Sequence, residues 1–143
     1  MEQAIREAQA AAARGEVPVG AVVTDAAGRV LATAGNQVEE RCDPSAHAEM
    51  LALREAARVM GDKHLAGCTL TVTLEPCAMC AQAASLFRVG RLVFGAYDPK
   101  GGGTEHGARI FAHTQCNHVP DVVGGVREAE CGALLSGFFA RLR

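Results

Sequence analysis

The chain has 143 residues, of which 49% are hydrophobic and 21% are charged, a mixture that is typical of one globular domain and excludes a largely disordered protein. No apolar run reaches the roughly 18 residues of a membrane-spanning helix, so we expect no membrane partner. The net charge of -2 lacks the basic excess of a protein that grips a long stretch of phosphate backbone, so any contact with nucleic acid is expected to be local.

The N-terminal segment carries no basic start followed by an apolar block, so it does not read as a secretory signal. We therefore expect a cytoplasmic protein whose thiols stay reduced. The six cysteines then point to metal binding or simple burial rather than to disulfides: Cys42, Cys68, Cys77, Cys80, Cys116 and Cys131.

The first half of the chain predicts a helix, a hairpin and a second helix. Residues 2–14 are rich in alanine and end at Gly15, a residue type suited to the position after a helix. Residues 17–25 and 29–36 are β-rich runs that suit a hairpin with its turn near Gly28. Residues 46–60 place apolar side chains at helical spacing, namely Met50, Leu53, Ala57 and Met60.

The second half predicts alternating strands and helices. Residues 69–74 alternate threonine with apolar residues and run into a segment where Pro76 is placed to begin a helix. Residues 91–98 predict a further strand, and residues 127–143 a closing helix. This order indicates an α/β sandwich with helices on both sheet faces, in which the first strand pair is antiparallel and later strands are parallel.

The C-x-x-C pair, Cys77 and Cys80, has the spacing that lets two sulfurs hold one metal. By itself it also fits a redox pair or two small buried residues. A four-ligand structural zinc site would need a second ligand pair such as another C-x-x-C, and the chain offers none. A three-ligand, open site is the arrangement that fits most easily.

His47 is the candidate third ligand, and Glu49 follows it at the start of a predicted helix. Side chains two apart in a helix interior point to nearly opposite sides, but in the first turn both can curl over the helix end. We therefore expect two helix N-termini to converge on one Zn²⁺ held by His47, Cys77 and Cys80.

Such a donor set cancels the charge of Zn²⁺ and leaves the fourth position for water, whose pKa the metal lowers toward neutrality. Glu49 then suits a catalytic base that takes the water proton and passes it to a ring nitrogen of a bound base. Singly, a core histidine or a solvated first-turn glutamate explains either residue. The joint pattern H-x-E and P-C-x-x-C favours catalysis, and Glu49 argues against the alternative of a silent zinc scaffold.

The segments "HAE" and "PCAMC" resemble the signature of the cytidine and deoxycytidylate deaminase superfamily. The flanking segments are more specific and are similar to bacterial tRNA adenosine deaminases, which convert the wobble adenosine of an anticodon to inosine. They are "EVPVGAV", "DPSAHAEMLALREA", "TLTVTLEPCAMCAQA", "RLVFGAYDPK", "CNH" and "LLSGFFARLR". The likeness covers nearly the whole chain.

The resemblance implies a three-layer α/β/α fold with a mixed five-stranded sheet, formed by one zinc-dependent deaminase domain over residues 1–143. It also implies one Zn²⁺ per subunit, a homodimer and a tRNA anticodon loop as substrate. By motif position, Val17 and Pro18 would line the base pocket and Asn36 would hydrogen-bond the target nucleotide. Asp98 would lie near its sugar, and Lys100 would meet phosphate.

Two regions bear on the choice of substrate. The segment Gly101–Phe111 departs from the family's usual small residues followed by serine and leucine, and it is expected to border the nucleic-acid channel. Phe138 and Phe139 are adjacent on the closing helix, so they cannot both face one core. Either at least one is partly exposed and available to stack on a base, or both wedge into the sheet or a dimer contact. A free base or nucleoside such as guanine or cytosine is the alternative substrate.

Overall fold

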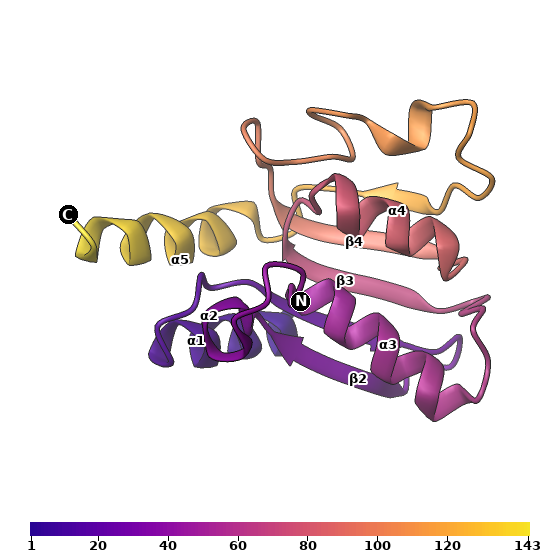
Figure 1. Cartoon of the computed structure of the whole chain (residues 1–143), viewed down its shortest axis with the longest axis horizontal. Coiled ribbons are helices and arrows are strands. Elements are labelled where there is room, and N and C mark those ends of the chain that lie inside the picture. Colours follow the sequence, from indigo (N-terminus) through magenta and orange to yellow (C-terminus); the bar gives the residue numbers. More distant parts are fainter.

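The computed structural model describes residues 1–143, which form a five-stranded sheet between two layers of helices (Figure 1). The strand order is β2-β1-β3-β4-β5. This confirms the expected α/β/α fold with a mixed sheet. The elements in chain order are α1 (Glu2–Ala13), β1 (Gly20–Thr24), β2 (Val30–Gly35), α2 (Val38–Arg41), α3 (Ala48–Met60), β3 (Thr69–Leu74), α4 (Ala78–Leu86), β4 (Arg91–Ala96), a 3-10 turn (Ile110–Ala112), β5 (Asp121–Val123) and α5 (Glu128–Arg141).

The predicted hairpin is present, with β1 and β2 antiparallel and Gly20 opposite Gly35. Its turn contains Gly28 at φ +83°, a left-handed conformation that favours glycine. Oδ1 of Asp25 accepts hydrogen bonds from the backbone amides of Ala27 and Arg29, both at 2.9 Å. The turn is therefore fixed by local chemistry that is visible in the sequence.

The interior of the sheet departs from the prediction at one junction. β1 also pairs with β3 in antiparallel fashion, and only β3–β4 and β4–β5 are parallel. The residue patterns had given four strands, because β5 has only 3 residues and is too short to show periodicity. The sequence did not predict the short helix α2, of 4 residues, for the same reason.

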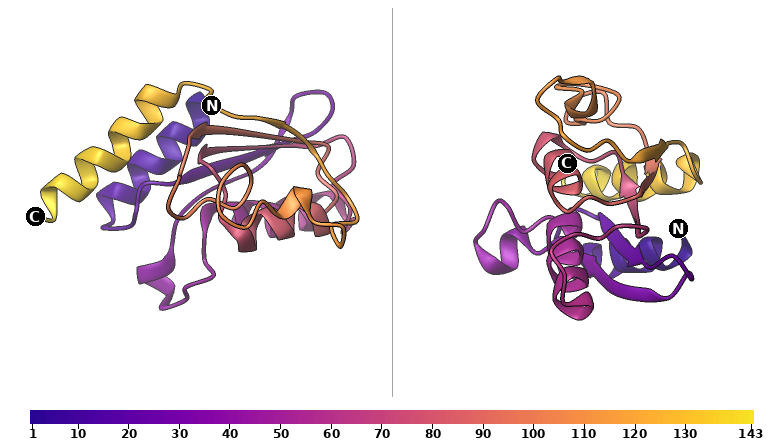
Figure 2. Two further views of the ribbon diagram at one scale, coloured as in Figure 1. Left: turned by 90° about the horizontal axis from the view of Figure 1, so that it is seen from above. Right: turned by 90° about the vertical axis from the view of Figure 1, so that its right-hand side faces the viewer.

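The helices cover the two faces of the sheet in pairs. The helices α3 and α4 contact each other, and α3 also packs on β1 and β2, while α1 and α5 pack together on the opposite face (Figure 2). Glycines in the strands allow α1 and α5 to lie close to the sheet. A Cβ on Gly20 of β1 would clash with the backbone of α1, and a Cβ on Gly95 of β4 would clash with the side chain of Cys131 in α5. The main core lies between the sheet and the helices α3 and α4.

Three local predictions are wrong in detail. Pro76 lies before α4 rather than in its first turn, because Cys77 is the N-cap residue. Met60, the last residue of α3, is exposed, although Leu53 of the predicted stripe is buried and Met50 and Ala57 pack against the core. The closing helix predicted over residues 127–143 ends at Arg141, and Leu142 after it is exposed, since the end of α5 extends beyond the sheet (Figure 1). None of the helices is long and apolar enough to cross a bilayer.

Candidate metal centre and active site

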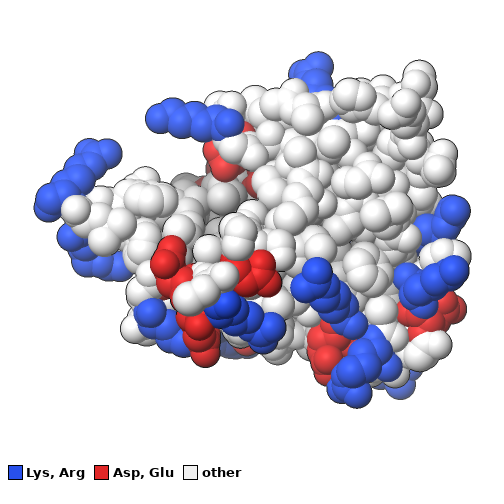
Figure 3. Space-filling model, viewed as in Figure 1, with Lys and Arg blue, Asp and Glu red and all other residues white.

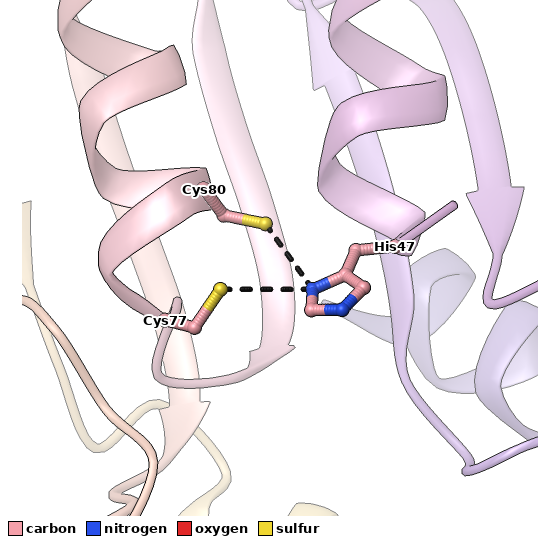
Figure 4. A group of neighbouring side chains, drawn as sticks. All are labelled: His47, Cys77 and Cys80. Atoms are coloured by element: carbon pink, nitrogen blue, oxygen red, sulfur yellow. Dashed lines mark hydrogen bonds between the residues drawn. The ribbon is translucent and has the colours of Figure 1, made fainter. Parts of the chain in front are cut away.

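Two helix N-termini meet at the site, as the sequence predicts. His47 is the N-cap of α3 and Cys77 is the N-cap of α4, and both have extended backbones. Because an N-cap residue is not yet helical, its side chain can turn across the end of the helix. Cys80 lies one turn further along α4, and its sulfur faces the same point. Figure 4 shows the imidazole of His47 directed at both sulfurs.

The three side chains have the separations of a tetrahedral metal site. Nδ1 of His47 lies 3.6 Å from Sγ of Cys77 and 3.5 Å from Sγ of Cys80, and all three candidate donor atoms lie within 4.8 Å of one another. Zinc bonds of about 2.3 Å to sulfur and 2.0–2.1 Å to nitrogen, at a tetrahedral angle, require a nitrogen–sulfur distance of about 3.5–3.6 Å. The residues therefore fit one zinc ion and leave a fourth position that no protein side chain takes.

The pKa values of the three side chains are shifted by the hydrogen bonds among them. The thiol of Cys80 donates a hydrogen bond that lowers the pKa of Cys77 to about 4. The pKa of His47 is raised, chiefly by its hydrogen bond to Cys77. The pKa of Cys80 is raised by the same pairing with Cys77 and by burial. The N-terminal end of α4 adds positive potential that favours thiolate. A bound zinc ion would displace the protons of Cys80 and His47, because its ligands are thiolate and neutral imidazole.

Glu49 sits in the first turn of α3 and is 4% exposed. Burial raises the pKa of its carboxyl to about 7. Its Oε2 is the one buried side-chain oxygen or nitrogen in the chain without a hydrogen-bond partner. Buried polar atoms of folded proteins are nearly always paired, so an orphaned carboxylate oxygen beside a metal-binding cluster indicates a partner that the chain itself does not supply. A water molecule or substrate meets that need.

A cavity of about 570 Å³ opens over the cluster, which is within the usual range for small-molecule sites. Segments from both halves of the chain and from the free end of α5 line it. Its lining includes Glu16, Val17, Val19, Asn36, Val38, Glu39, Pro44, His47, Glu49, Leu74, Glu75, Cys77, Asp98, Gly101, Phe138, Phe139 and Leu142.

The structure brings most of the predicted substrate residues to this cavity. Val17, Asn36, Asp98, Phe138 and Phe139 all line it. The two aromatic rings meet edge to face with centroids 5.4 Å apart. Phe138 is buried, whereas Phe139 is 43% exposed, so one ring of the pair is available as expected.

Two predicted contacts do not line the cavity. Pro18 is fully buried, so its ring supports the wall behind Val17 rather than forming the surface. Lys100 is exposed outside the cavity, and its backbone amide donates to Oδ1 of Asp98 at 3.2 Å. Sequence position alone placed these residues near the substrate, but the alternation of side-chain direction along the backbone decides which of them face it.

Asn36 also has a structural task that the sequence did not reveal. Its Oδ1 accepts a hydrogen bond from the amide of Ala48 at 2.8 Å, in the first turn of α3. In the turn before this helix, the hydroxyl of Ser45 donates to Oδ1 of Asp43 at 2.7 Å, so neither side chain caps α3. The side-chain NH₂ of Asn36 makes no hydrogen bond within the chain and remains for a ligand in the cavity.

We expect Asn36→Ala to loosen the site as well as weaken substrate binding. The Ala48 amide loses its acceptor, which costs about 1–3 kcal/mol when a buried donor is left unpaired. Denaturant unfolding measures this loss. Gln37→Ala is the control, because it changes the neighbouring residue and leaves Asn36 in place. It should unfold near the denaturant midpoint of the parent. An Asn36→Ala variant with parental stability would contradict the capping role.

Two buried carboxylates of the cavity wall have structural roles that the sequence did not reveal. Glu16 accepts hydrogen bonds from the amides of Glu39 and Glu40 at 3.2 and 2.8 Å, so it fixes the start of α2. Glu75 directly follows β3 and accepts several hydrogen bonds from the segment after β4. An acidic residue placed between an apolar strand and the P-C-x-x-C motif was the available signal for Glu75.

Comparison with known proteins identifies the family. Residues 1–96 match the model of the cytidine and deoxycytidylate deaminase zinc-binding region. A tRNA-specific adenosine deaminase of Agrobacterium fabrum is 49% identical over 144 residues, covering 100% of this chain and 93% of that protein. The chain belongs to the tRNA-specific adenosine deaminase family. It thus carries the zinc-binding deaminase domain that the cluster of His47, Cys77 and Cys80 fits.

Further members of the tRNA-specific adenosine deaminase family agree with this assignment. The Bacillus subtilis protein of that name is 48% identical over 143 residues, covering 100% of this chain and 88% of the relative. A solved structure from a study of A-to-I editing by tRNA:A34 deaminases superposes with a TM-score of 0.92 at 48% identity. The superposition covers 94% of this chain and 97% of that one.

Proposed function

We propose that this protein is a zinc-dependent hydrolase that converts adenosine to inosine at the wobble position of a tRNA anticodon. The observation that carries the chemistry is the unpaired, buried Oε2 of Glu49 beside the cluster of His47, Cys77 and Cys80. The choice of substrate is supported by the full-length similarity to proteins named for it.

We further propose that His47, Cys77 and Cys80 hold one zinc ion per subunit. When bound, zinc supplies a Lewis acid that lowers the pKa of a water molecule toward neutrality. A single domain over residues 1–143 would then carry both the metal and the pocket. A homodimer and a cytoplasmic location remain part of the same proposal.

Glu49 is the proton carrier of the reaction. Its carboxylate takes one proton as water adds to C6 of the adenine ring, and it delivers that proton to N1. When the C6–N bond breaks, Glu49 takes the proton of the new C6 hydroxyl and passes it to the amino group, which leaves as ammonia, so adenosine and water give inosine and ammonia. The enclosed position of Glu49 keeps bulk water from competing for the proton.

We propose a place for each part of the nucleotide along the cavity walls. The NH₂ of Asn36 donates to an acceptor of the base, and Val17 packs against the face of the ring. Asp98 accepts from the sugar, and Lys100, just outside the cavity, meets the adjoining phosphate. Phe139, which is 43% exposed beside Phe138, offers a ring on which a neighbouring base can stack.

The target must be unpaired, since a base held in a duplex cannot enter such a pocket. An anticodon loop supplies bases that can be turned outward. Figure 3 shows basic side chains at the free end of α5, where Arg141 and Arg143 lie, and others interleaved with acidic residues along the lower edge. This distribution suits a short loop rather than a long duplex.

The test is deamination of a tRNA anticodon stem-loop with adenosine at the wobble position. We expect inosine at that position and no deamination of adenosine elsewhere in the loop. A stem-loop with wobble guanosine is the control for positional selectivity. Free adenine, guanine, cytosine and cytidine form parallel reactions. Deamination of a free base with an unaltered stem-loop would replace this proposal by the free-base alternative.

A further inference from the structure

Glu75 is a buried carboxylate that the reaction described above does not use. It directly follows β3 and precedes the ligand Cys77. Its side chain is 0% exposed although it reaches the wall of the cavity. A carboxylate that is removed from water requires several hydrogen bonds to remain ionised. The partners of Glu75 therefore show what it holds in place.

All five donors to Glu75 come from one segment, residues 98–106, which we call the clamped segment. Oε1 accepts from the backbone amide of Asp98 at 3.0 Å and faces Nδ1 of His106 at 2.8 Å. Oε2 accepts from the hydroxyl of Thr104 at 3.1 Å. It also accepts from the backbone amides of Glu105 and His106, both at 3.0 Å. One carboxylate thus gathers both ends of the segment.

The three glycines of the clamped segment explain why it can lie so close to the metal centre. A Cβ on Gly102 would come 2.5 Å from Oε2 of Glu75, and one on Gly103 would clash with the backbone of Ala78. The amide of Gly103 donates to the carbonyl oxygen of Pro76 at 2.7 Å. The segment is therefore packed against the chain that carries Cys77.

Asp98 is the residue through which this arrangement reaches the cavity. Its amide is held by Glu75, and its Oδ1 accepts from the amides of Lys100 and Gly101 at 3.2 and 2.9 Å. Oδ2 makes no hydrogen bond to the chain and is the oxygen left for a ligand. The position of that oxygen is set by the clamped segment, whose two ends are both hydrogen-bonded to Glu75.

We propose that Glu75 is a positioning residue for deamination, which acts by holding Asp98 and the clamped segment as one wall of the cavity. This inference rests on the proposed function for its kinetic consequences, but the clamp itself is a property of the fold. His106 is the side-chain partner that completes the clamp.

The direct test is amide hydrogen exchange of Glu75→Gln. A glutamine keeps the shape, but it turns an NH₂ group toward donors that need an acceptor. We expect faster exchange in residues 98–106, with β1 and β2 unchanged and zinc content near that of the parent. Asp25→Asn is the matched control, because Asp25 also accepts two backbone amides and an arginine in a turn, but far from the cavity.

Kinetics on the wobble-adenosine stem-loop give the second measurement. We expect Glu75→Gln to lower kcat/KM by about 10- to 100-fold, the range for misplacing a contact group. In an Asp98→Ala background the same change should cost less than roughly 3-fold, since effects that pass through one residue do not add. If Glu75→Gln lowered kcat/KM by the same factor with and without Asp98→Ala, Glu75 would not act through Asp98.

His106→Ala provides a milder variant if Glu75→Gln does not fold. It removes one donor and leaves the other four, so we expect faster exchange near residue 106 and a smaller loss in kcat/KM. Parental exchange in residues 98–106 for both variants would overturn the clamp. A parent enzyme inactive on the stem-loop would defeat the proposed function instead, while the exchange experiment would still decide whether Glu75 holds the segment.

Discussion

Glu49→Gln is expected to lower kcat for wobble-adenosine deamination by about 10²- to 10⁴-fold, the usual contribution of a positioned acid–base group. The amide can neither take a proton from water nor deliver one to the adenine ring. Zinc content should remain near one per subunit, because Glu49 is a neighbour of the three ligands and not one of them. Single-turnover kinetics on the stem-loop and metal analysis of the same sample measure the two quantities.

Glu55→Gln is the matched control for this change. It makes the same substitution on the same helix, but Glu55 is exposed and pairs with Arg58 at the surface. We expect parental turnover from the control. If Glu49→Gln kept near-parental kcat with full zinc, Glu49 would not be the proton carrier. If it lost zinc, the carboxylate would belong to the metal site and the mechanism would have to change.

Cys80→Ala should abolish tight zinc binding and lower stability together. Metal that binds only the folded state at a thousandfold excess over Kd contributes about 4 kcal/mol to the free energy of unfolding. Loss of one thiolate leaves His47 and Cys77, which make an incomplete donor set. Denaturant unfolding with and without a chelator is the measurement. The chelator should lower the midpoint of the parent strongly and that of Cys80→Ala hardly at all.

Cys131→Ala separates lost metal from lost packing. Cys131 is 1% exposed in a different cluster, between α5 and the sheet, so its truncation removes a buried sulfur without touching the metal site. We expect this variant to bind zinc as the parent does and to remain sensitive to the chelator. Full zinc occupancy in Cys80→Ala would contradict the assignment of Cys80 as a ligand.

The local elements were predictable because their signals are local. The alternation of threonine and apolar residues in 69–74, the glycine in the turn of the hairpin and the helical spacing in 46–60 all gave elements that the structure contains. β5 and α2 were missed because neither is long enough to show a period. The antiparallel pairing of β1 with β3 joins segments far apart in sequence, and no local pattern specifies such a partner.

The centre of the site was also predictable, since it consists of characteristic residue types at fixed spacing. His47 and Cys77 are each the last residue before a helix, so the local fold already directs their side chains over the helix ends. The residues that line the pocket were harder to predict. Val17 and Pro18 are neighbours of the same apolar character, yet only Val17 faces the cavity.

The sequence by itself determined which atoms we propose for the chemistry: an imidazole and two thiolates for a cation, and a carboxylate to move a proton. Only the tertiary structure decided what holds those atoms still. Asn36 caps α3 across the space between two elements, and Glu75 gathers a segment that follows the next strand. Such long-range hydrogen bonds depend on where the packed core places each backbone amide, and this is a property of the whole fold rather than of residue spacing.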